Sequence, residues 1–331
     1  MLFSCLIDAD RLDTADFEEP YLTELRNNGK YRSWDELIDR LEKKLSAFKK
    51  QNRVDILRNE ISGYCRNNSS KPKGIYLLTV PTGGGKTLAS LRFALYHAKK
   101  HEMDRVIYVI PYTSIIDQNA GETRSFLEDR DACGNLLNRV VLEHHSNLTP
   151  EEETWQQKIL SQDWDAPVVF TTSVQVLEAL FGSGTRGARR MYQLARSVII
   201  FDEVQTLPVL CVHMFNNAIN FLVRSCGSTV VLCTATQPLL DNVDKKLGYL
   251  NFSPDQEMMP DVERFFEELK RVAMHDKRKI HGWSSDEVSE LAVQSLKDTG
   301  SVLIIVNTRK AALELYEKCL LKMKHSLRSM V

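Results

Sequence analysis

Short apolar runs alternate along this chain with stretches that have the spacing of amphipathic helices. Six of the runs are almost continuously apolar, at residues 75–80, 106–110, 140–142, 168–171, 198–202 and 230–233. Such runs are typical of a parallel sheet covered by helices, because neither face of its strands meets water. The pattern predicts an α/β fold, with one doubly wound parallel sheet over about residues 50–245.

Helical patterns are also expected on both sides of the predicted sheet domain. Before it, Ser33 and Glu36 have the spacing of a capping box. A stripe that favours packing follows at Leu37, Leu41, Leu45 and Phe48. After it, residues 251–261 are rich in proline and acids and predict a linker. A helix over 285–297, a strand over 301–307 and a helix over 309–324 are then expected, so the predicted divisions are 1–49, 50–245 and 246–331.

Composition narrows the class of protein. The 331 residues are 43% hydrophobic and 26% charged, with a net charge of −1, so contacts with nucleic acid need local basic patches. No apolar run is long enough to span a membrane, and acids stand where a signal peptide needs a basic start. The seven cysteines include no C-x-x-C pair, which favours reduced core residues in a cytoplasmic chain.

The strongest chemical signal is the loop PTGGGKT, which joins the run at 75–80 to a helical pattern. After Thr82, the glycines Gly83, Gly84 and Gly85 allow a tight turn whose N–H groups face an anion at the helix N-terminus. Lys86 then reaches the terminal phosphates of a nucleotide, and the hydroxyl of Thr87 binds Mg²⁺. Val80 stands where the usual pattern has glycine, a departure that suggests one group of nucleotide motors. The alternative, an ordinary glycine-rich turn, fits less well with a strand before it and a helix after it.

Two further signals lie at the ends of later predicted strands. The segment SVIIFDEVQ places Asp202 and Glu203 at a strand tip, where doubly wound sheets bind ligands. Asp202 is positioned to hold Mg²⁺ through water, and Glu203 to deprotonate the water that attacks the γ-phosphate. The segment TVVLCTATQP adds Thr234 and Thr236, whose hydroxyls can bond Glu203 or the phosphates, although a plain turn also explains them.

Taken together, PTGGGKT, DEVQ and TAT in this order resemble the superfamily 2 helicases, in which two RecA-like lobes clamp ATP. The resemblance implies ATP and Mg²⁺ as cofactors, and catalytic roles for Lys86, Asp202 and Glu203. It implies that Gln205, Thr234 and Thr236 couple the nucleotide to the nucleic acid. It further implies contacts with single-stranded DNA at Pro111, Thr113, Ser114, Thr171, Thr172, Ser173 and Gln175. Asn307 and Thr308 resemble the first motif of the second lobe, which implies that they contact the nucleic acid as well.

Two segments, LIDADRLDT and VVLEHHSNL, resemble the CRISPR-associated helicase-nuclease of type I interference systems, an antiviral family. In that family a histidine–aspartate (HD) nuclease domain with a divalent transition metal precedes the lobes. Residues 1–49 then correspond to the helical end of that domain plus a linker, with Asp10 as its last metal ligand, and residues 246–331 to an incomplete second lobe. An RNA-guided surveillance complex is the implied partner. His144 and His145 come too late to be nuclease ligands and suggest a loop near DNA or a partner.

The resemblance and its gaps lead to specific expectations. We expect ATP–Mg²⁺ binding with very slow hydrolysis, because the second-lobe motifs that supply arginine fingers are missing. We expect no nuclease activity from Asp10 alone, since a catalytic metal pair needs several ligands. The alternatives are another superfamily 2 DNA or RNA helicase, and a nucleotide-dependent clamp that binds nucleic acid without turnover. His97 and His101, one helical turn apart, predict a solvated helix end.

Overall fold

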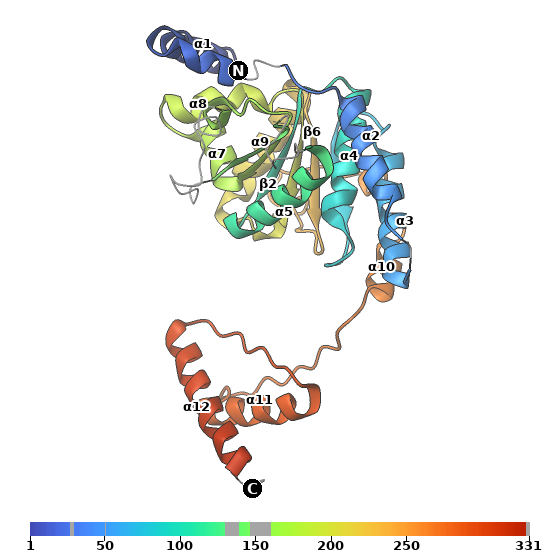
Figure 1. The fold of residues 1–331 in the computed structure, drawn as a ribbon, viewed down its shortest axis with the longest axis vertical. Coiled ribbons are helices and arrows are strands. Elements are labelled where there is room, and N and C mark those ends of the chain that lie inside the picture. Colours follow the sequence, from blue (N-terminus) through green and yellow to red (C-terminus); the bar gives the residue numbers. More distant parts are fainter. Residues whose placement is uncertain (27–29, 50, 130–138, 146–159, 329–331) are drawn as a thin grey trace. The chain divides into compact units, whose positions relative to one another are not determined.

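The structure is a computed structural model that describes residues 1–26, 30–49, 51–129, 139–145 and 160–328. It contains two compact units, Met1–Lys270 and Arg271–Val331 (Figure 1). The first unit holds the predicted sheet.

A six-stranded parallel sheet forms the centre of the first unit. Its strands are β1 (Ile75–Thr79), β2 (Arg105–Ile110), β3 (Val141–His144), β4 (Val168–Thr172), β5 (Ser197–Asp202) and β6 (Thr229–Thr234). They lie in the order β1-β6-β5-β2-β4-β3, and each neighbouring pair is parallel. All carboxyl ends therefore meet at one edge, which we call the carboxyl edge. The predicted α/β fold is confirmed.

Helices cover both faces of this sheet. One face packs against α2 (Trp34–Ser46), α3 (Arg53–Asn68), α4 (Lys86–Lys100), α5 (Thr113–Leu127) and α10 (Val262–Glu268). The other packs against α7 (Ser173–Phe181) and α9 (Val212–Ser225), with α8 (Thr185–Met191) beside α7 (Figure 1). Leu91 on α4 and Phe215 on α9 are buried in the respective cores. Among the described residues, none of the helices combines the length and the apolar character that a membrane span requires.

Residues 1–49 belong to the first compact unit. The Ser33 hydroxyl caps α2 by accepting a hydrogen bond from the Glu36 N–H at 3.3 Å, and Leu37 is fully buried in the core shared with α4. The first helix, α1 (Leu2–Glu18), is followed by a short 3-10 helix (Pro20–Leu25) and docks on α8. Asp8 of α1 pairs there with Arg189 at 2.7 Å.

The segment predicted as a linker, 251–261, packs instead along the free edge of β1. The N–H of Met258 donates to the carbonyl of Leu77 at 2.9 Å, and Glu257 forms an isolated parallel bridge with Leu77. Met258 and Met259 are buried, as is Phe265 in α10. The first compact unit therefore includes this segment and ends at Lys270, whereas the last predicted division begins at residue 246. Burial of the two methionines in the segment, and of Phe265 just after it, favours packing against the sheet over the extended linker that the proline and acid content predicts.

The second unit contains the two predicted helices without the strand expected between them. Its helices are α11 (Ser285–Thr299) and α12 (Arg309–Arg328), and residues 301–306 have no regular structure. A strand needs a neighbour for its N–H and C=O groups, and no strand occurs in the described part of this unit. The prediction of a strand over 301–307 is therefore wrong in this structure.

His97 on α4 is buried, contrary to the expected solvated helix end. Its ring nitrogens lie 2.8 Å from the carbonyl oxygen of Ser69 and 2.9 Å from the hydroxyl of Thr229. Its ring stacks on Phe93 at a centroid distance of 5.0 Å. Burial lowers the pKa of His97 to about 4, so this side chain is neutral in the folded chain at neutral pH.

This burial predicts a loss of stability in mild acid. The unfolded chain protonates His97 near its ordinary pKa of about 6.5, whereas the folded chain resists until about pH 4. Stability is therefore fully present above about pH 6.5 and decreases as the pH falls toward 4. From this residue we expect a loss of about 2 kcal/mol between pH 7 and pH 5. Urea unfolding of the wild type and of His97→Gln, which cannot titrate, tests this. If the free energy of unfolding changed equally with pH in the two chains, the result would contradict this prediction.

Candidate nucleotide-binding site

The loop between β1 and α4 has the tight backbone that its glycines predict. Gly83 and Gly85 lie in the left-handed region, with φ of +84° and +80°. The N–H of Gly84 donates to the carbonyl of Pro81 at 3.0 Å, and a Cβ on Gly84 would lie 2.5 Å from Cγ1 of Val80. Val80, buried at the position of the usual glycine, thus fills the inside of the turn and leaves room for glycine alone at position 84.

Lys86, the first residue of α4, pairs with Glu203 beyond the end of β5. Lys86 Nζ lies 2.5 Å from Glu203 Oε1, and their side chains are 11% and 30% exposed. Burial lowers the pKa of Lys86, but Cys233, Glu203 and Asp202 raise it by more, so it lies above its ordinary value. Burial conversely raises the pKa of Glu203, but hydrogen bonds from Lys86 and Gln205 bring it below its ordinary value. Both groups are therefore charged at neutral pH.

The backbone at Glu203 is strained. Its φ is +53°, a left-handed conformation that costs a residue with a side chain about 1–3 kcal/mol. Two hydrogen bonds hold it there, because its N–H donates to the carbonyl of Cys233 at 2.9 Å and to Asp202 Oδ1 at 3.1 Å. In this conformation the Glu203 carboxylate, just beyond the end of β5, contacts Lys86.

The predicted coupling residues continue from this ion pair as one hydrogen-bonded network. Gln205 Nε2 donates to Glu203 Oε2 at 2.6 Å, and the hydroxyl of Thr234 donates to Gln205 Oε1. The N–H of Thr236 donates in turn to the Thr234 hydroxyl at 3.0 Å. The network runs without a break from Lys86 to the turn after β6, so DEVQ and TAT are joined in space as well as by order.

Thr87 and Asp202 offer oxygen ligands of the kind that Mg²⁺ prefers. They neighbour Lys86 and Glu203 in sequence, so the ion pair joins the two segments that carry them. Burial raises the pKa of Asp202, and the nearby charge of Lys86 offsets this only in part. A hydroxyl and such a carboxylate fit the metal.

Three other residues support the loop and were missed by sequence reasoning. Arg58 Nε donates to the carbonyl of Gly83 at 2.9 Å, and Gln237 Nε2 donates to the hydroxyl of Thr79 at 3.0 Å. The same hydroxyl donates to the half-buried carboxylate of Glu257 at 2.5 Å. The only local signal was the position of Gln237 directly after TAT.

The predicted nucleic-acid residues of the first unit follow two neighbouring strands. Ile110 of β2 lies opposite Thr172 of β4, so Pro111, Thr113 and Ser114 share the carboxyl edge with Ser173 and Gln175. Thr172 caps α7, accepting from the N–H of Gln175 at 3.3 Å. The Gln175 side-chain oxygen accepts from Arg190 at 2.9 Å.

Thr171 differs from the other predicted contacts. It is fully buried, and its hydroxyl donates to the carbonyl of His144 on β3 at 3.0 Å. Its side chain is therefore a link between β4 and β3 inside the sheet.

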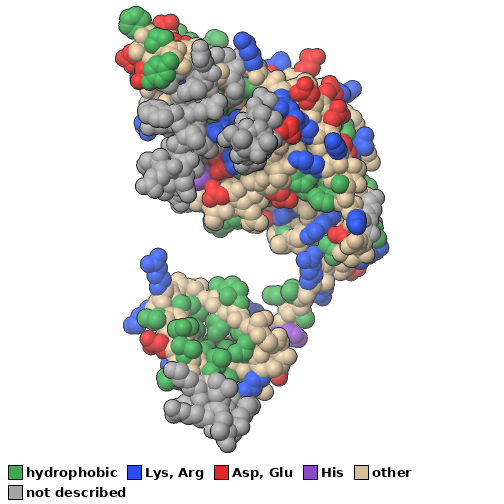
Figure 2. All heavy atoms as spheres, viewed as in Figure 1, with side chains coloured by type: hydrophobic (Ala, Val, Ile, Leu, Met, Phe, Trp, Pro, Cys, Tyr) green, Lys and Arg blue, Asp and Glu red, His purple; other side chains and the backbone are tan. Residues whose placement is uncertain are grey.

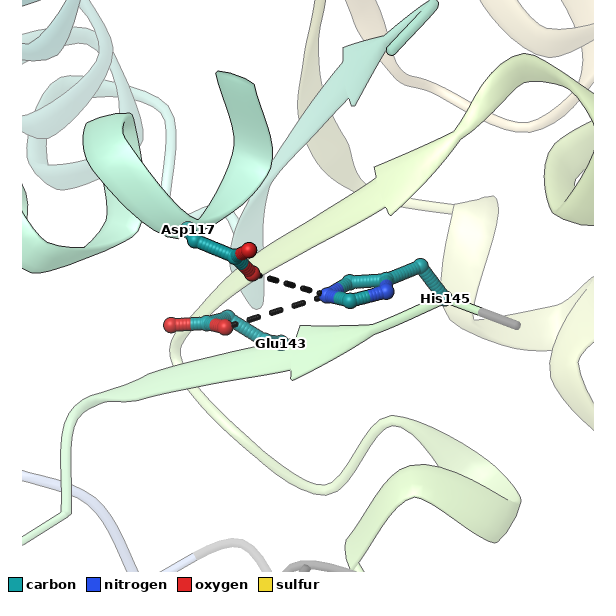
Figure 3. Close-up of side chains that lie close together, drawn as sticks. All are labelled: Asp117, Glu143 and His145. Atoms are coloured by element: carbon teal, nitrogen blue, oxygen red, sulfur yellow. Dashed lines mark hydrogen bonds and ion pairs between the residues drawn. The ribbon is translucent and has the colours of Figure 1, made fainter. Parts of the chain in front are cut away.

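The remaining predicted residues belong to other elements of the chain. Asn307 and Thr308 are exposed in the second unit, where Thr308 accepts from the N–H of Ala311 at 3.2 Å. Asp10 is exposed on α1. Within the described residues, the one group of ligand-type side chains close enough to share a metal is Asp117, Glu143 and His145 (Figure 3), and Asp10 is not part of it.

A parallel sheet whose β1 leads through a glycine loop into a helix, with paired carboxylates after β5, defines a P-loop nucleotide-binding domain. The DEAD/DEAH box helicase family model matches residues 68–245, and the chain belongs to this family.

Similarity to individual proteins agrees with the predicted resemblance. The chain is 31% identical over 188 residues to the CRISPR-associated nuclease/helicase Cas3 of Haloferax volcanii, a match that covers 50% of this chain and 19% of Cas3. It is 24% identical over 198 residues to Activating signal cointegrator 1 complex subunit 3 of Rattus norvegicus, covering 56% of this chain and 8% of that protein. The crystal structure of T. fusca Cas3 with AMPPNP is 19% identical, with a TM-score of 0.46 over 59% of this chain and 22% of that one. The chain thus spans about a fifth of the Cas3 proteins it matches.

The loop geometry predicts that one cation governs nucleotide affinity. Lys86→Ala removes the charge that faces the phosphates, so we expect ATP to bind about 10- to 100-fold more weakly. Glu203→Gln keeps the loop and releases Lys86, so its ATP affinity should stay within about threefold of the wild type. Isothermal titration with Mg²⁺–ATP compares them. Equal affinity in the wild type and Lys86→Ala would disprove the assignment of the loop.

Proposed function

We propose that this chain carries the ATP-binding lobe of an ATP-dependent single-stranded DNA translocase of CRISPR type I interference. The observation that carries the proposal is the unbroken network from Lys86 through Glu203 and Gln205 to Thr234. It lies at the same carboxyl edge as the predicted nucleic-acid segments. The similarity to Haloferax volcanii Cas3, which is named a nuclease/helicase, supports the CRISPR branch of the family.

In this proposal ATP competes with Glu203 for Lys86. The Lys86 ammonium turns from the carboxylate to the terminal phosphates, and Glu203 is released to accept a proton from the attacking water. Gln205 stays hydrogen-bonded to Glu203 Oε2, so a movement of Glu203 is transmitted through Gln205 to Thr234. Thr87 and Asp202 would hold Mg²⁺, which when bound neutralises charge on the phosphate oxygens.

Single-stranded DNA is proposed to lie across the ends of β2 and β4. Two helices, α5 and α7, begin there, and their N-termini carry partial positive charge. Ser114 at the start of α5 and Ser173 at the start of α7 add hydroxyl donors. Such donors suit backbone phosphates and carry no base information.

The resemblance to the CRISPR-associated family suggests two further activities, recruitment by a partner complex and cleavage of DNA. An RNA-guided surveillance complex would recruit the motor, and an HD nuclease domain with a divalent transition metal would cut the DNA. Asp10 offers one carboxylate toward that metal, and a metal pair needs several converging ligands.

The first test of this function is ATP hydrolysis. Glu203→Gln removes the proposed base while ATP stays bound, so the very slow hydrolysis expected of the wild type should fall further, by at least about 100-fold per bound ATP. Glu102→Gln is the matched control, since Glu102 has the same side chain and a left-handed φ of +51° but lies away from the carboxyl edge, between α4 and β2. We expect its rate to equal that of the wild type. A single-turnover phosphate-release assay with protein in excess compares the three chains, and equal hydrolysis of bound ATP in all three, faster than that of ATP alone, would reject the proposal.

The second test is binding of single-stranded DNA. Because the proposed contacts go to phosphates, log K should fall with log salt by about 0.7 per phosphate neutralised, and affinity should be nearly independent of base sequence. Fluorescence anisotropy with two labelled oligonucleotides of different sequence measures both. Strong preference for one oligonucleotide at every salt concentration would contradict phosphate-based contact.

A further inference from the structure

Two side chains of α5 contact two side chains at the end of β3. His145 Nε2 lies 3.0 Å from Asp117 Oδ1 and 3.9 Å from Glu143 Oε2 (Figure 3). A carboxylate only accepts hydrogen bonds, so His145 Nε2 is the donor to Asp117. Seven residues along α5, the Arg124 guanidinium pairs with the same Glu143. The helix is thus fixed to β3 at two points on one face.

The strand side of this contact is buried and the helix side reaches solvent. The side chains of His145 and Glu143 are 3% and 7% exposed, whereas that of Asp117 is 62% exposed. Burial raises the pKa of Glu143, which Arg124 partly offsets. His145 is therefore the fixed partner, and Asp117 is the point at which α5 is held.

This contact lies one helical turn from a predicted DNA-binding segment. Asp117 comes three and four residues after Ser114 and Thr113, and residues at that spacing are neighbours on a helix surface. Holding Asp117 therefore fixes the direction in which the first turn of α5 presents its hydroxyls.

The residue before His145 contacts the second predicted segment. The carbonyl of His144 accepts from the buried hydroxyl of Thr171 at 3.0 Å, and Trp164 Nε1 donates to His144 Nδ1 at 3.2 Å. Burial lowers the pKa of His144 to about 3, so its ring is a neutral acceptor. Thr171 directly precedes Thr172, the cap of α7. Two adjacent histidines therefore connect the start of α5 with the start of α7.

We propose that His145 is a positioning residue that sets the start of α5 relative to the start of α7, so that both meet one DNA backbone. The proposal rests on the proposed function, in which these two segments bind single-stranded DNA. It adds a role for His145, which follows β3 and is not itself one of the predicted DNA contacts.

A metal is the other use that this cluster offers. The three ligand-type atoms lie within 4.8 Å of one another. However, Arg124 already occupies Glu143 and places a positive charge beside the point where a cation would sit. Asp117 and His145 also satisfy each other. The geometry favours positioning, and metal binding becomes an outcome of the test.

The test measures binding of labelled oligothymidylate and of Mg²⁺–ATP to the full chain and its variants. Asp117→Ala alters an exposed side chain, so folding is preserved, and His145→Leu removes the donor. Each should weaken DNA binding about tenfold, and the double variant should lose no more than either single one. ATP affinity should stay within about twofold of the wild type, and His145→Gln, which retains a donor, should recover DNA binding to within about threefold.

Asp104→Ala is the matched control, because it breaks an exposed pair with Arg196 at the opposite edge of the sheet. We expect wild-type DNA binding from it. DNA affinity equal to the wild type in Asp117→Ala and His145→Leu, or losses that add in the double variant, would overturn the inference alone. DNA binding by the wild type that requires added Mn²⁺, with no such requirement in His145→Leu, would overturn it in favour of a metal site. No DNA binding by the wild type would reject the proposed function itself.

Discussion

The ion pair between Lys86 and Glu203 is the contact on which the site depends. β1 and β5 are not neighbours, because β6 lies between them, so the pair spans the tip of β6. There it meets Gln205 and Thr234, which complete the network over that tip. Both charges are partly shielded from water, Lys86 more than Glu203, and each is stabilised by the other. In the proposed function, a bound phosphate takes the place of the Glu203 carboxylate beside Lys86. Glu203 is then released to act as the base.

The order of the parallel strands determines how the predicted site residues are arranged along the carboxyl edge. Every strand ends at the carboxyl edge, so position along that edge follows strand order alone. The predicted nucleotide-binding residues lie at the ends of β1, β6 and β5, and the predicted DNA-binding segments follow β2 and β4. Because β5 pairs with β2, the two sets are separated by one strand spacing of about 4.8 Å. His144, the last residue of β3, and His145 lie at the end of the strand next to β4.

The sequence predicted what local patterns determine. All six strands and the loop were predictable, because buried parallel strands are continuously apolar and a tight anion-binding turn needs glycine. The pairing of Gln205 with Thr234 was predictable only as a shared neighbourhood. Glu257 could not be predicted, since its contact with Thr79 arises from a segment that lines the edge of β1. The burial of His97 could not be predicted. Helical spacing shows which face of α4 the residue lies on, but it does not show that Ser69 and Thr229 pack over this end of the helix.

The strand expected over 301–307 failed for a related reason. Its residues are apolar and β-branched, which favours a strand, but a strand exists only with a partner. Pairing depends on residues distant in sequence, and local propensity carries no information about them. The same limit applies to Arg58, whose contact with Gly83 joins two elements through a single hydrogen bond.

The central claim is that the Lys86–Glu203 pair marks a phosphate site, and it is tested most directly by a crystal structure of the chain with Mg²⁺ and a non-hydrolysable ATP analogue. The measured quantity is the position of Lys86 Nζ. The account predicts that this nitrogen leaves Glu203 Oε1, now 2.5 Å away, and contacts the terminal phosphate while Gln205 still holds Glu203. A nucleotide bound elsewhere, with the Lys86–Glu203 pair unchanged, would contradict it.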